Sequence, residues 1–216
     1  MVTPVGVNHL ISSRNRSAQV ADIRIHFGDV AARCEEFIRG SRQIVGAVAW
    51  ARNPKLMAAL AKRPVSLIVN KEFALRKKGS KERVALAQLR GGVSGFPQPA
   101  RCVGDCSRGL FTGLMHHKFL VRLDRDMPTA VWTGSFNLTT GAAGNFENAV
   151  EIHDPLVAVE FFVEFARLYE ISEPLDFRQG TPAQRKTRSE TSSKTRTSGK
   201  RPTNRKSSSA VRDRSA

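Results

Sequence analysis

The chain contains little cysteine and no long apolar run, and each shortage excludes a class of protein. Its 216 residues include three cysteines, and an odd count without a recognisable export signal argues against a disulfide-stabilised secreted fold. Met1–Val20 has no continuous apolar core of the kind that a signal peptide needs. The longest apolar candidate, Pro155–Leu168, is interrupted by charged residues, whereas a membrane helix needs roughly 18–20 apolar residues. We therefore expect a cytoplasmic protein with no stable membrane insertion.

Acidic residues are also scarce, with 19 Asp and Glu against 35 Lys and Arg, which gives a net charge of +16. Much of the excess falls in residues 178–216, which hold 12 Lys and Arg, two acidic residues and no aromatic residue. Such a segment cannot bury enough apolar surface to offset its ordering entropy, so we expect a disordered tail. A basic tail favours nucleic-acid binding through counterion release, although it is also typical of a solubilising segment.

The change in composition near Phe177 divides the chain into three parts. We expect an N-terminal segment over residues 1–20 that the sequence leaves undefined, a catalytic domain over residues 21–177, and the basic tail over residues 178–216. Within the domain, short apolar runs such as Gln43–Trp50 indicate buried strands, and segments of helical periodicity lie between them. Strands that alternate with helices predict a layered α/β domain.

Local signals place the elements that flank the middle of the chain. Ala21–Phe27 alternates like a strand, and Asp29 is placed to cap the helix that follows. Gly91–Gly113 is rich in turn residues and predicts a long loop. Phe146–Ile152 reads as a further strand, and Asp154 begins a helix with an apolar stripe.

The residues with the most chemical potential lie between these elements, in MHHKFLVRLDRDMPTAVWTGSFNLTTGAAGNFENAVEI. His116 and Lys118 are two apart in a β-favouring run, so a strand would point both to one face, and Ser135 and Asn137 share that spacing. An imidazole can attack phosphorus near neutral pH, while an ammonium and a carboxamide can neutralise and bind phosphate oxygens. Glu147 is a candidate to hold the far nitrogen of His116 and fix its tautomer.

The order His-x-Lys, Gly-Ser-x-Asn and Glu-Asn resembles the signature of the phospholipase D superfamily, H-x-K-x4-D-x6-G-S-x-N. The resemblance implies a mixed β-sheet flanked by helices on both faces and phosphodiester cleavage through a phosphohistidine, with no cofactor or metal. It implies that His116 is nucleophile or general acid, that Lys118 and Asn137 bind the phosphate with Ser135 in support, and that Glu147 orients the histidine. His117 fills the variable position and should face the opposite side.

One position departs from the signature. Five residues after Lys118 the family carries an aspartate, whereas this chain has Leu123, followed by Asp124 and Asp126. The segment between Lys118 and Gly134 is also longer than in the signature. A β-bulge together with a longer hairpin loop over residues 124–129 would accommodate both differences.

Only one such motif is present, although the two-step reaction needs one histidine to attack and one to protonate the leaving oxygen. The resemblance therefore implies a homodimer with a shared active site. We expect a metal-independent nuclease, an endonuclease-like phosphodiesterase acting on DNA or RNA, as small single-motif members of the family commonly are. A lipid phosphodiesterase with the same chemistry and a non-catalytic nucleic-acid-binding module are the alternatives.

Other side chains are weaker candidates for binding. Arg76, Lys77 and Lys78 lie in a basic segment that would either grip a phosphate backbone or form an ordinary solvated connection. Cys102 and Cys106 have a spacing that hints at zinc, but reduced thiols without metal are the better reading. His26 and His153 near strand ends favour structural roles, and Trp50 and Trp132 fit core or pocket-wall positions.

Overall fold

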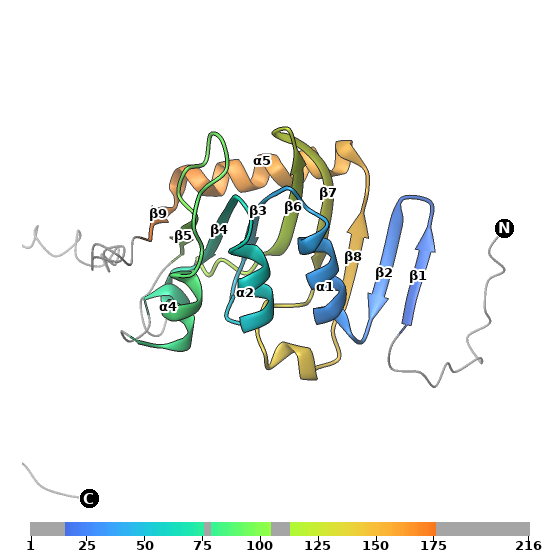
Figure 1. The fold of residues 1–216 in the computed structure, drawn as a ribbon, viewed down its shortest axis with the longest axis horizontal. Coiled ribbons are helices and arrows are strands. Elements are labelled where there is room, and N and C mark those ends of the chain that lie inside the picture. Colours follow the sequence, from blue (N-terminus) through green and yellow to red (C-terminus); the bar gives the residue numbers. More distant parts are fainter. Residues whose placement is uncertain (1–15, 76–78, 105–112, 176–216) are drawn as a thin grey trace, which may run out of the picture. The chain divides into compact units, whose positions relative to one another are not determined.

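The computed structural model describes residues 16–75, 79–104 and 113–175, and all of them belong to one compact unit, Met1–Arg185. The described strands form a nine-stranded sheet in the order β1-β2-β8-β7-β6-β3-β4-β5-β9 (Figure 1). β3, β4 and β5 pair in parallel and the other neighbours pair antiparallel, so the sheet is mixed.

The described elements have the following bounds. The strands are β1 (Arg16–Val20), β2 (Ile23–Phe27), β3 (Gln43–Val48), β4 (Val65–Asn70), β5 (Ala100–Val103), β6 (Lys118–Asp124), β7 (Met127–Gly134), β8 (Asn148–Ile152) and β9 (Glu173–Pro174). The helices are α1 (Val30–Arg39), α2 (Pro54–Leu60), α3 (Lys71–Ala74), α4 (Lys81–Leu86), the 3₁₀ helix η1 (Ala142–Gly144) and α5 (Pro155–Ile171).

Two apolar cores lie on opposite faces of the sheet, which confirms the predicted α/β architecture with helices on both sides. On one face α1 and α2 bury side chains such as Phe37 and Leu56 against the sheet. On the other face α5 packs Phe165 and Leu168 against Phe119 of β6 (Figure 1). Burial of each such side chain contributes roughly 1.5–3 kcal/mol, so these faces supply most of the driving force for folding.

Helix ends follow the capping signals with one exception. The Asn53 side chain accepts hydrogen bonds from the first turn of α2, and the Asp154 side chain does the same for α5. Asp29 also occupies the position before α1, but it lies in the left-handed region with φ 37° and makes no capping hydrogen bond. The prediction of an Asp29 cap is therefore wrong, because that backbone conformation turns the side chain away from the first turn.

Several boundaries differ from the sequence-based expectation. The sheet begins at Arg16 rather than Ala21, because β1 forms a hairpin with β2. The predicted long loop Gly91–Gly113 contains β5, which pairs with β4 and β9. The hairpin between β6 and β7 has no longer loop, because Arg125 and Asp126, both with positive φ, form a two-residue turn.

Candidate functional site

The signature residues lie together at one end of the inner strands β3, β6, β7 and β8, and we call this end of the sheet the site edge. Val48 at the end of β3 pairs with Lys118 at the start of β6, and Gly134 at the end of β7 pairs with Ala149 at the start of β8. The segments that continue from these ends carry Trp50, the histidine pair and the GSFN turn, and the loop with η1 closes the edge below the sheet (Figure 1). β3, which is distant in sequence, thus meets the three consecutive strands β6, β7 and β8 where the candidate residues lie.

His116 and Lys118 contact each other directly. The Lys118 Nζ atom lies 3.1 Å from Nδ1 and 3.2 Å from Nε2 of His116, and it donates a hydrogen bond to the His116 carbonyl at 2.8 Å. His116 itself lies before β6, which begins at Lys118, so the prediction of one strand through both residues is wrong. The two side chains still meet, because the Lys118 side chain folds back over the preceding residues.

The electrostatics of this pair keep both groups closer to neutral than they would be in water. Loss of solvent around the largely exposed ring, followed by the Lys118 ammonium and then His117, holds the pKa of His116 below its ordinary value of 6.5. Burial likewise lowers the pKa of Lys118, with Glu147 acting in the opposite direction. A neutral imidazole has a free lone pair, so the arrangement favours a nucleophilic nitrogen.

Glu147 has other partners than the predicted one. Its carboxylate accepts a hydrogen bond from the Ser135 hydroxyl and a longer one, 3.5 Å, from the Asn145 amide. The Ser135 hydroxyl in turn accepts the Asn148 N–H at 3.1 Å. Among the described residues, the donors to this carboxylate are thus Ser135 and Asn145, and the expected hydrogen bond from a His116 ring nitrogen is not found. Glu147 acts on Lys118 through charge alone.

The GSFN turn places Asn137 beneath the edge. Gly134 lies so close to Asn148 that a Cβ atom would clash with the Asn148 carbonyl, and this approach lets the Ser135 N–H donate to that carbonyl at 3.1 Å. Phe136 is buried in the core, as predicted for a side chain under the turn. The Asn137 side chain is also buried, and its Oδ1 atom has no hydrogen-bond partner among the described residues. Any hydrogen bond from this amide to a phosphate oxygen would therefore have to come from its Nδ2 group, the donor of the carboxamide.

His117 points to the other face of the sheet, as the variable position predicted. Its Nε2 atom lies 3.2 Å from Glu164 Oε1 of α5, and its ring packs edge-on against Phe119 with centroids 5.7 Å apart. Those contacts direct it away from Lys118. It is therefore a natural control for any experiment on His116.

At the position of the family aspartate this chain has a core residue, Leu123. Leu123 is buried against the α5 face, and Asp124 is exposed at the far end of β6, where it pairs with Arg42 at 3.2 Å. Asp126 lies in the hairpin turn beyond it. The predicted β-bulge is present between Arg122 and Leu123. Asp124 is six residues along β6 from Lys118, about 20 Å at ~3.3 Å per residue, so neither aspartate reaches the site edge.

Beside Glu147 the surface is hollowed. A hollow of about 270 Å³ opens between the start of α1, at Gly28 and Asp29, and the η1 loop, with Asn145 and Glu147 in its wall. None of these residues except Glu147 was predicted at the site. Only the strand pairing of β2 with β8, which a sequence pattern does not reveal, brings Gly28 and Asp29 to this edge.

Some predicted binding residues lie outside the described residues, namely Arg76, Lys77, Lys78, Cys106 and the tail 178–216. Cys102 is buried in the core, and within the described ranges no three His, Cys, Asp or Glu side chains cluster as a metal site requires. Cys34 is buried as well, and burial raises the pKa of its thiol, which keeps it protonated and inert.

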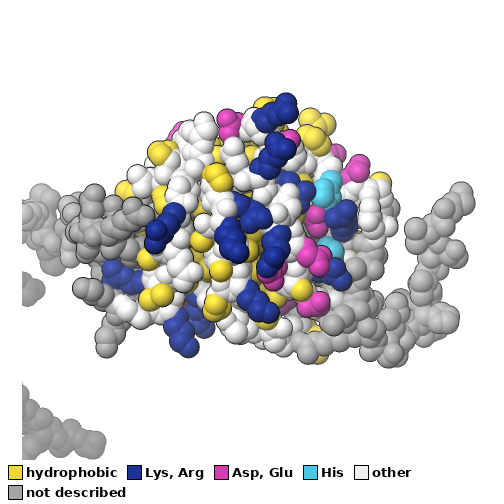
Figure 2. Space-filling view, viewed as in Figure 1, with side chains coloured by type: hydrophobic (Ala, Val, Ile, Leu, Met, Phe, Trp, Pro, Cys, Tyr) yellow, Lys and Arg dark blue, Asp and Glu magenta, His cyan; other side chains and the backbone are white. Residues whose placement is uncertain are grey.

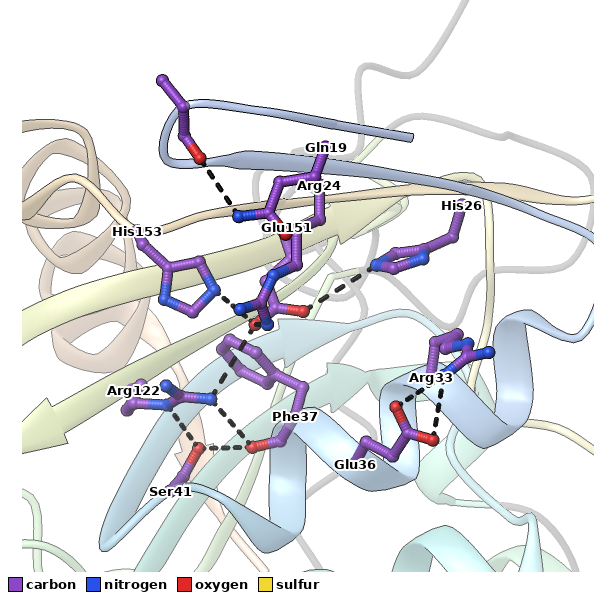
Figure 3. Close-up of polar contacts among 11 residues, drawn as sticks. Gln19, Arg24, His26, Arg33, Glu36, Phe37, Ser41, Arg122, Glu151 and His153 are labelled. Carbon is purple, nitrogen blue, oxygen red and sulfur yellow. Dashed lines mark hydrogen bonds and ion pairs between the residues drawn. The ribbon is translucent and has the colours of Figure 1, made fainter. Parts of the chain in front are cut away.

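A second polar cluster, which the sequence did not predict, surrounds Glu151 under α1 (Figure 3). The buried Glu151 Oε1 atom lies 2.5 Å from His153 Nε2, 3.3 Å from Arg24 Nη1 and 4.0 Å from Arg122 Nη2. His26 Nε2 approaches the other carboxylate oxygen at 3.8 Å, and its ring stacks on Trp132 with centroids 5.5 Å apart. His26 and His153 thus sit in a structural ion-pair network, in keeping with the roles expected of them.

Arg122 ties this Glu151 cluster to α1. Its Nε atom donates to the Ser41 hydroxyl at 3.1 Å, its Nη2 atom donates to the Phe37 carbonyl at 3.4 Å, and its guanidinium lies over the Phe37 ring (Figure 3). Ser41 also donates to the same carbonyl at 2.7 Å. The C-terminal end of α1 is thereby fixed to the sheet through one arginine.

Lys and Arg side chains are scattered over the face that Figure 2 shows, with several Asp and Glu side chains between them. This distribution agrees with the excess of basic residues in the composition. Among the described helices, none combines the length and the hydropathy that crossing a bilayer demands.

Two solved structures share this fold. NucT from Helicobacter pylori superposes with a TM-score of 0.55 at 14% identity, covering 70% of this chain and 98% of that one. A phospholipase D family member, Nuc from Salmonella typhimurium, superposes with a TM-score of 0.51 at 20% identity, covering 70% of this chain and 96% of that one. At these identities the likeness concerns the fold.

Sequence comparison adds a viral relative and a family. The uncharacterized protein L381 of Acanthamoeba polyphaga mimivirus is 27% identical over 207 residues, 79% of this chain and 74% of its own length. The family model described as "Cardiolipin synthase, PLD-like domain" matches residues 51–169, more than half of the chain and all of the signature residues. The chain therefore belongs to the phospholipase D-like family of phosphodiesterases.

Proposed function

We propose that the protein is a metal-independent nuclease that hydrolyses phosphodiester bonds through a phosphohistidine on His116. The observation that carries the proposal is the contact between the His116 ring and the Lys118 ammonium, at the edge that also holds Ser135, Asn137 and Glu147. Family membership supports the reaction class, and the net charge of +16 supports a polyanionic substrate.

In the proposed reaction a ring nitrogen of His116 attacks phosphorus while the bond to the leaving oxygen breaks. The Lys118 ammonium and the Asn137 amide stabilise the charge that gathers on the non-bridging oxygens. Water then attacks the phosphohistidine, releases the phosphate monoester and restores the imidazole. The lowered pKa of His116 supports the attacking role, because it keeps the ring neutral at a lower pH than a free histidine.

The leaving oxygen needs a proton, and we propose that His116 of the partner subunit provides it. The chain has one His-x-Lys motif, so a shared site on a two-fold axis supplies the second histidine. Light scattering tests this arrangement directly. A fully active monomer would rule out the shared site. If the site is shared, mixed dimers of wild-type and His116→Ala chains should retain little activity, because each site needs both histidines.

One observation favours a second substrate class. The description of the matching family model names cardiolipin synthase. A phospholipid contains a phosphodiester bond, as a nucleic acid does, so the same residues could act on it. We rank it second because the 35 Lys and Arg residues outnumber the 19 Asp and Glu residues, which supports a polyanionic substrate. Mixed phospholipid vesicles containing cardiolipin provide the substrate for this alternative.

The test is cleavage of a plasmid and of a labelled single strand in excess EDTA, with wild type, His116→Ala and His117→Ala side by side. We expect wild type and His117→Ala to cleave and His116→Ala to lose at least about a thousandfold in rate, as removal of a nucleophile does. His117→Ala is the matched control, because that ring faces α5. Equal activity of all three variants would contradict the assignment of His116.

A further inference from the structure

The ring of Trp50 is the second group that contacts His116. The indole and the imidazole meet edge to face, with centroids 5.5 Å apart and planes inclined by 76°. We propose that Trp50 is a positioning residue, which holds the His116 ring in the orientation from which it attacks phosphorus. The proposal rests on the proposed function, since it assigns the group that orients its nucleophile.

His116 needs such a support. The ring is largely exposed, and the carboxylate expected to orient it, Glu147, accepts hydrogen bonds from Ser135 and Asn145 instead. Lys118 Nζ lies almost equally far from both ring nitrogens, so it cannot point a straight hydrogen bond at either one. The ammonium therefore adds charge beside the ring but does little to select one orientation or tautomer.

Trp50 is itself firmly held. It follows β3, and its neighbour Ala49 donates a backbone hydrogen bond to the His117 carbonyl at 2.9 Å and accepts one from Asn70 at 3.2 Å. On its other side Ala51 forms a β-bridge with Leu138 of the GSFN segment. The indole is half-buried against the core of the α1 face. The indole is thus fixed to the backbone on either side of the site, at the residue next to His116 and at the residue after Asn137.

A fixed indole limits what the imidazole can do. An edge-to-face ring pair biases the rotamer equilibrium of the more mobile partner by roughly two- to tenfold. It also excludes water from one side of the imidazole, in the same direction as the desolvation that acts on His116. Nucleophilic attack requires the lone pair to be aligned with phosphorus, so loss of this bias should appear in kcat rather than in substrate binding.

The experiment compares Trp50→Leu and Trp50→Phe with Phe146→Leu, which removes a 90% exposed ring just before β8. Kinetics on a labelled oligonucleotide should show kcat lowered about three- to tenfold in Trp50→Leu, with KM within about twofold of wild type. Trp50→Phe keeps a ring and should retain most of kcat. In NMR spectra the His116 ring protons should lose the indole ring-current shift in Trp50→Leu and keep it in Phe146→Leu.

The NMR arm separates this inference from the proposed function. Unchanged His116 ring shifts in Trp50→Leu, or a kcat equal to that of wild type, would overturn the role of Trp50. Absence of cleavage by wild type would overturn the nuclease while the ring shifts still decide whether the indole holds the imidazole. Should Trp50→Leu not fold, cross-relaxation between His116 and Trp50 ring protons in wild type decides, and its absence overturns the proposal.

Discussion

Similar side chains occur near both ends of β6 and β8, but in different surroundings. At the site edge Lys118 and Glu147 lie near His116. Towards the opposite end, four residues later in each segment, Arg122 and Glu151 lie near two histidines. The Glu151 carboxylate is buried among two arginines, Arg24 and Arg122, and two histidines (Figure 3). Glu147, in contrast, is half-buried and bonded to a hydroxyl and an amide.

The difference shows how the partners and the burial of similar side chains distinguish a stabilising cluster from a candidate site. A buried charge persists only when partners satisfy it, and the partners of Glu151 do so by using their own donors. At the other end the His116 ring is exposed, so its nitrogen atoms remain accessible to a substrate.

The largest effect that tests this contrast comes from exchanging the two cations of β6 for methionine. Lys118→Met should lower the rate of diester cleavage by about 10²–10³, because it removes a cation from the transition-state charge, and should leave folding stability unchanged. Arg122→Met should lower the unfolding free energy by roughly 2 kcal/mol and leave the rate per folded molecule unchanged. Kinetics and urea unfolding of both variants measure this. If both variants changed the cleavage rate and the unfolding free energy equally, the contrast between the site edge and the Glu151 cluster would be wrong.

The next largest effect concerns the two glutamates. Glu151→Gln leaves Arg24 and Arg122 without their counter-charge, and we expect the unfolding free energy to fall by roughly 2–4 kcal/mol. Glu147→Gln can still accept the Ser135 hydroxyl, so its stability should change by less than ~0.5 kcal/mol. Urea denaturation of the pair decides. A Glu147→Gln variant as unstable as Glu151→Gln would show that the site edge is also held by buried charge.

The sequence predicted the residue types of the site better than their partners. The signature named His116, Lys118, Ser135 and Asn137, and the pairing of β6 with β3 and of β7 with β8 places the segments that carry them at the same ends of these strands. The signature did not predict the donors to the Glu147 carboxylate, Ser135 and Asn145, because they depend on a loop conformation that no spacing encodes.

The Glu151 cluster could not be predicted at all. Its members come from β2, β6, β8 and the residue just after β8, and they meet because β2 pairs with β8 and Arg122 reaches under α1. Pairing between strands so distant in sequence leaves no local signal, since each member read alone is an ordinary charged residue at a strand position. The pattern of buried strands predicted the layers, because burial of apolar faces depends on local periodicity.

The smallest effects are those of pH, and they separate the two histidine environments. Burial, opposed by Glu151 and reinforced by Arg33 and Arg24, holds the pKa of His26 below 6.5 in the folded protein. The unfolded chain therefore binds this proton more readily, so the unfolding free energy should rise with pH and level off above about 6.5. His26→Gln should flatten that rise when urea unfolding is followed from pH 5 to 8, and an unchanged slope would assign it to another group.

For His116 the same direction of shift should appear in catalysis rather than in stability. Loss of solvent and the Lys118 ammonium lower its pKa, so the neutral nucleophile persists to a pH below the ordinary 6.5, and the acid limb of kcat/KM should lie there too. The ring is exposed, so protonation changes folding little. In an NMR titration Lys118→Met should raise the pKa of His116 towards 6.5, while Arg122→Met should leave it where it is in wild type. A shift of equal size in both variants would mean that net charge, rather than the adjacent ammonium, sets the protonation of the nucleophile.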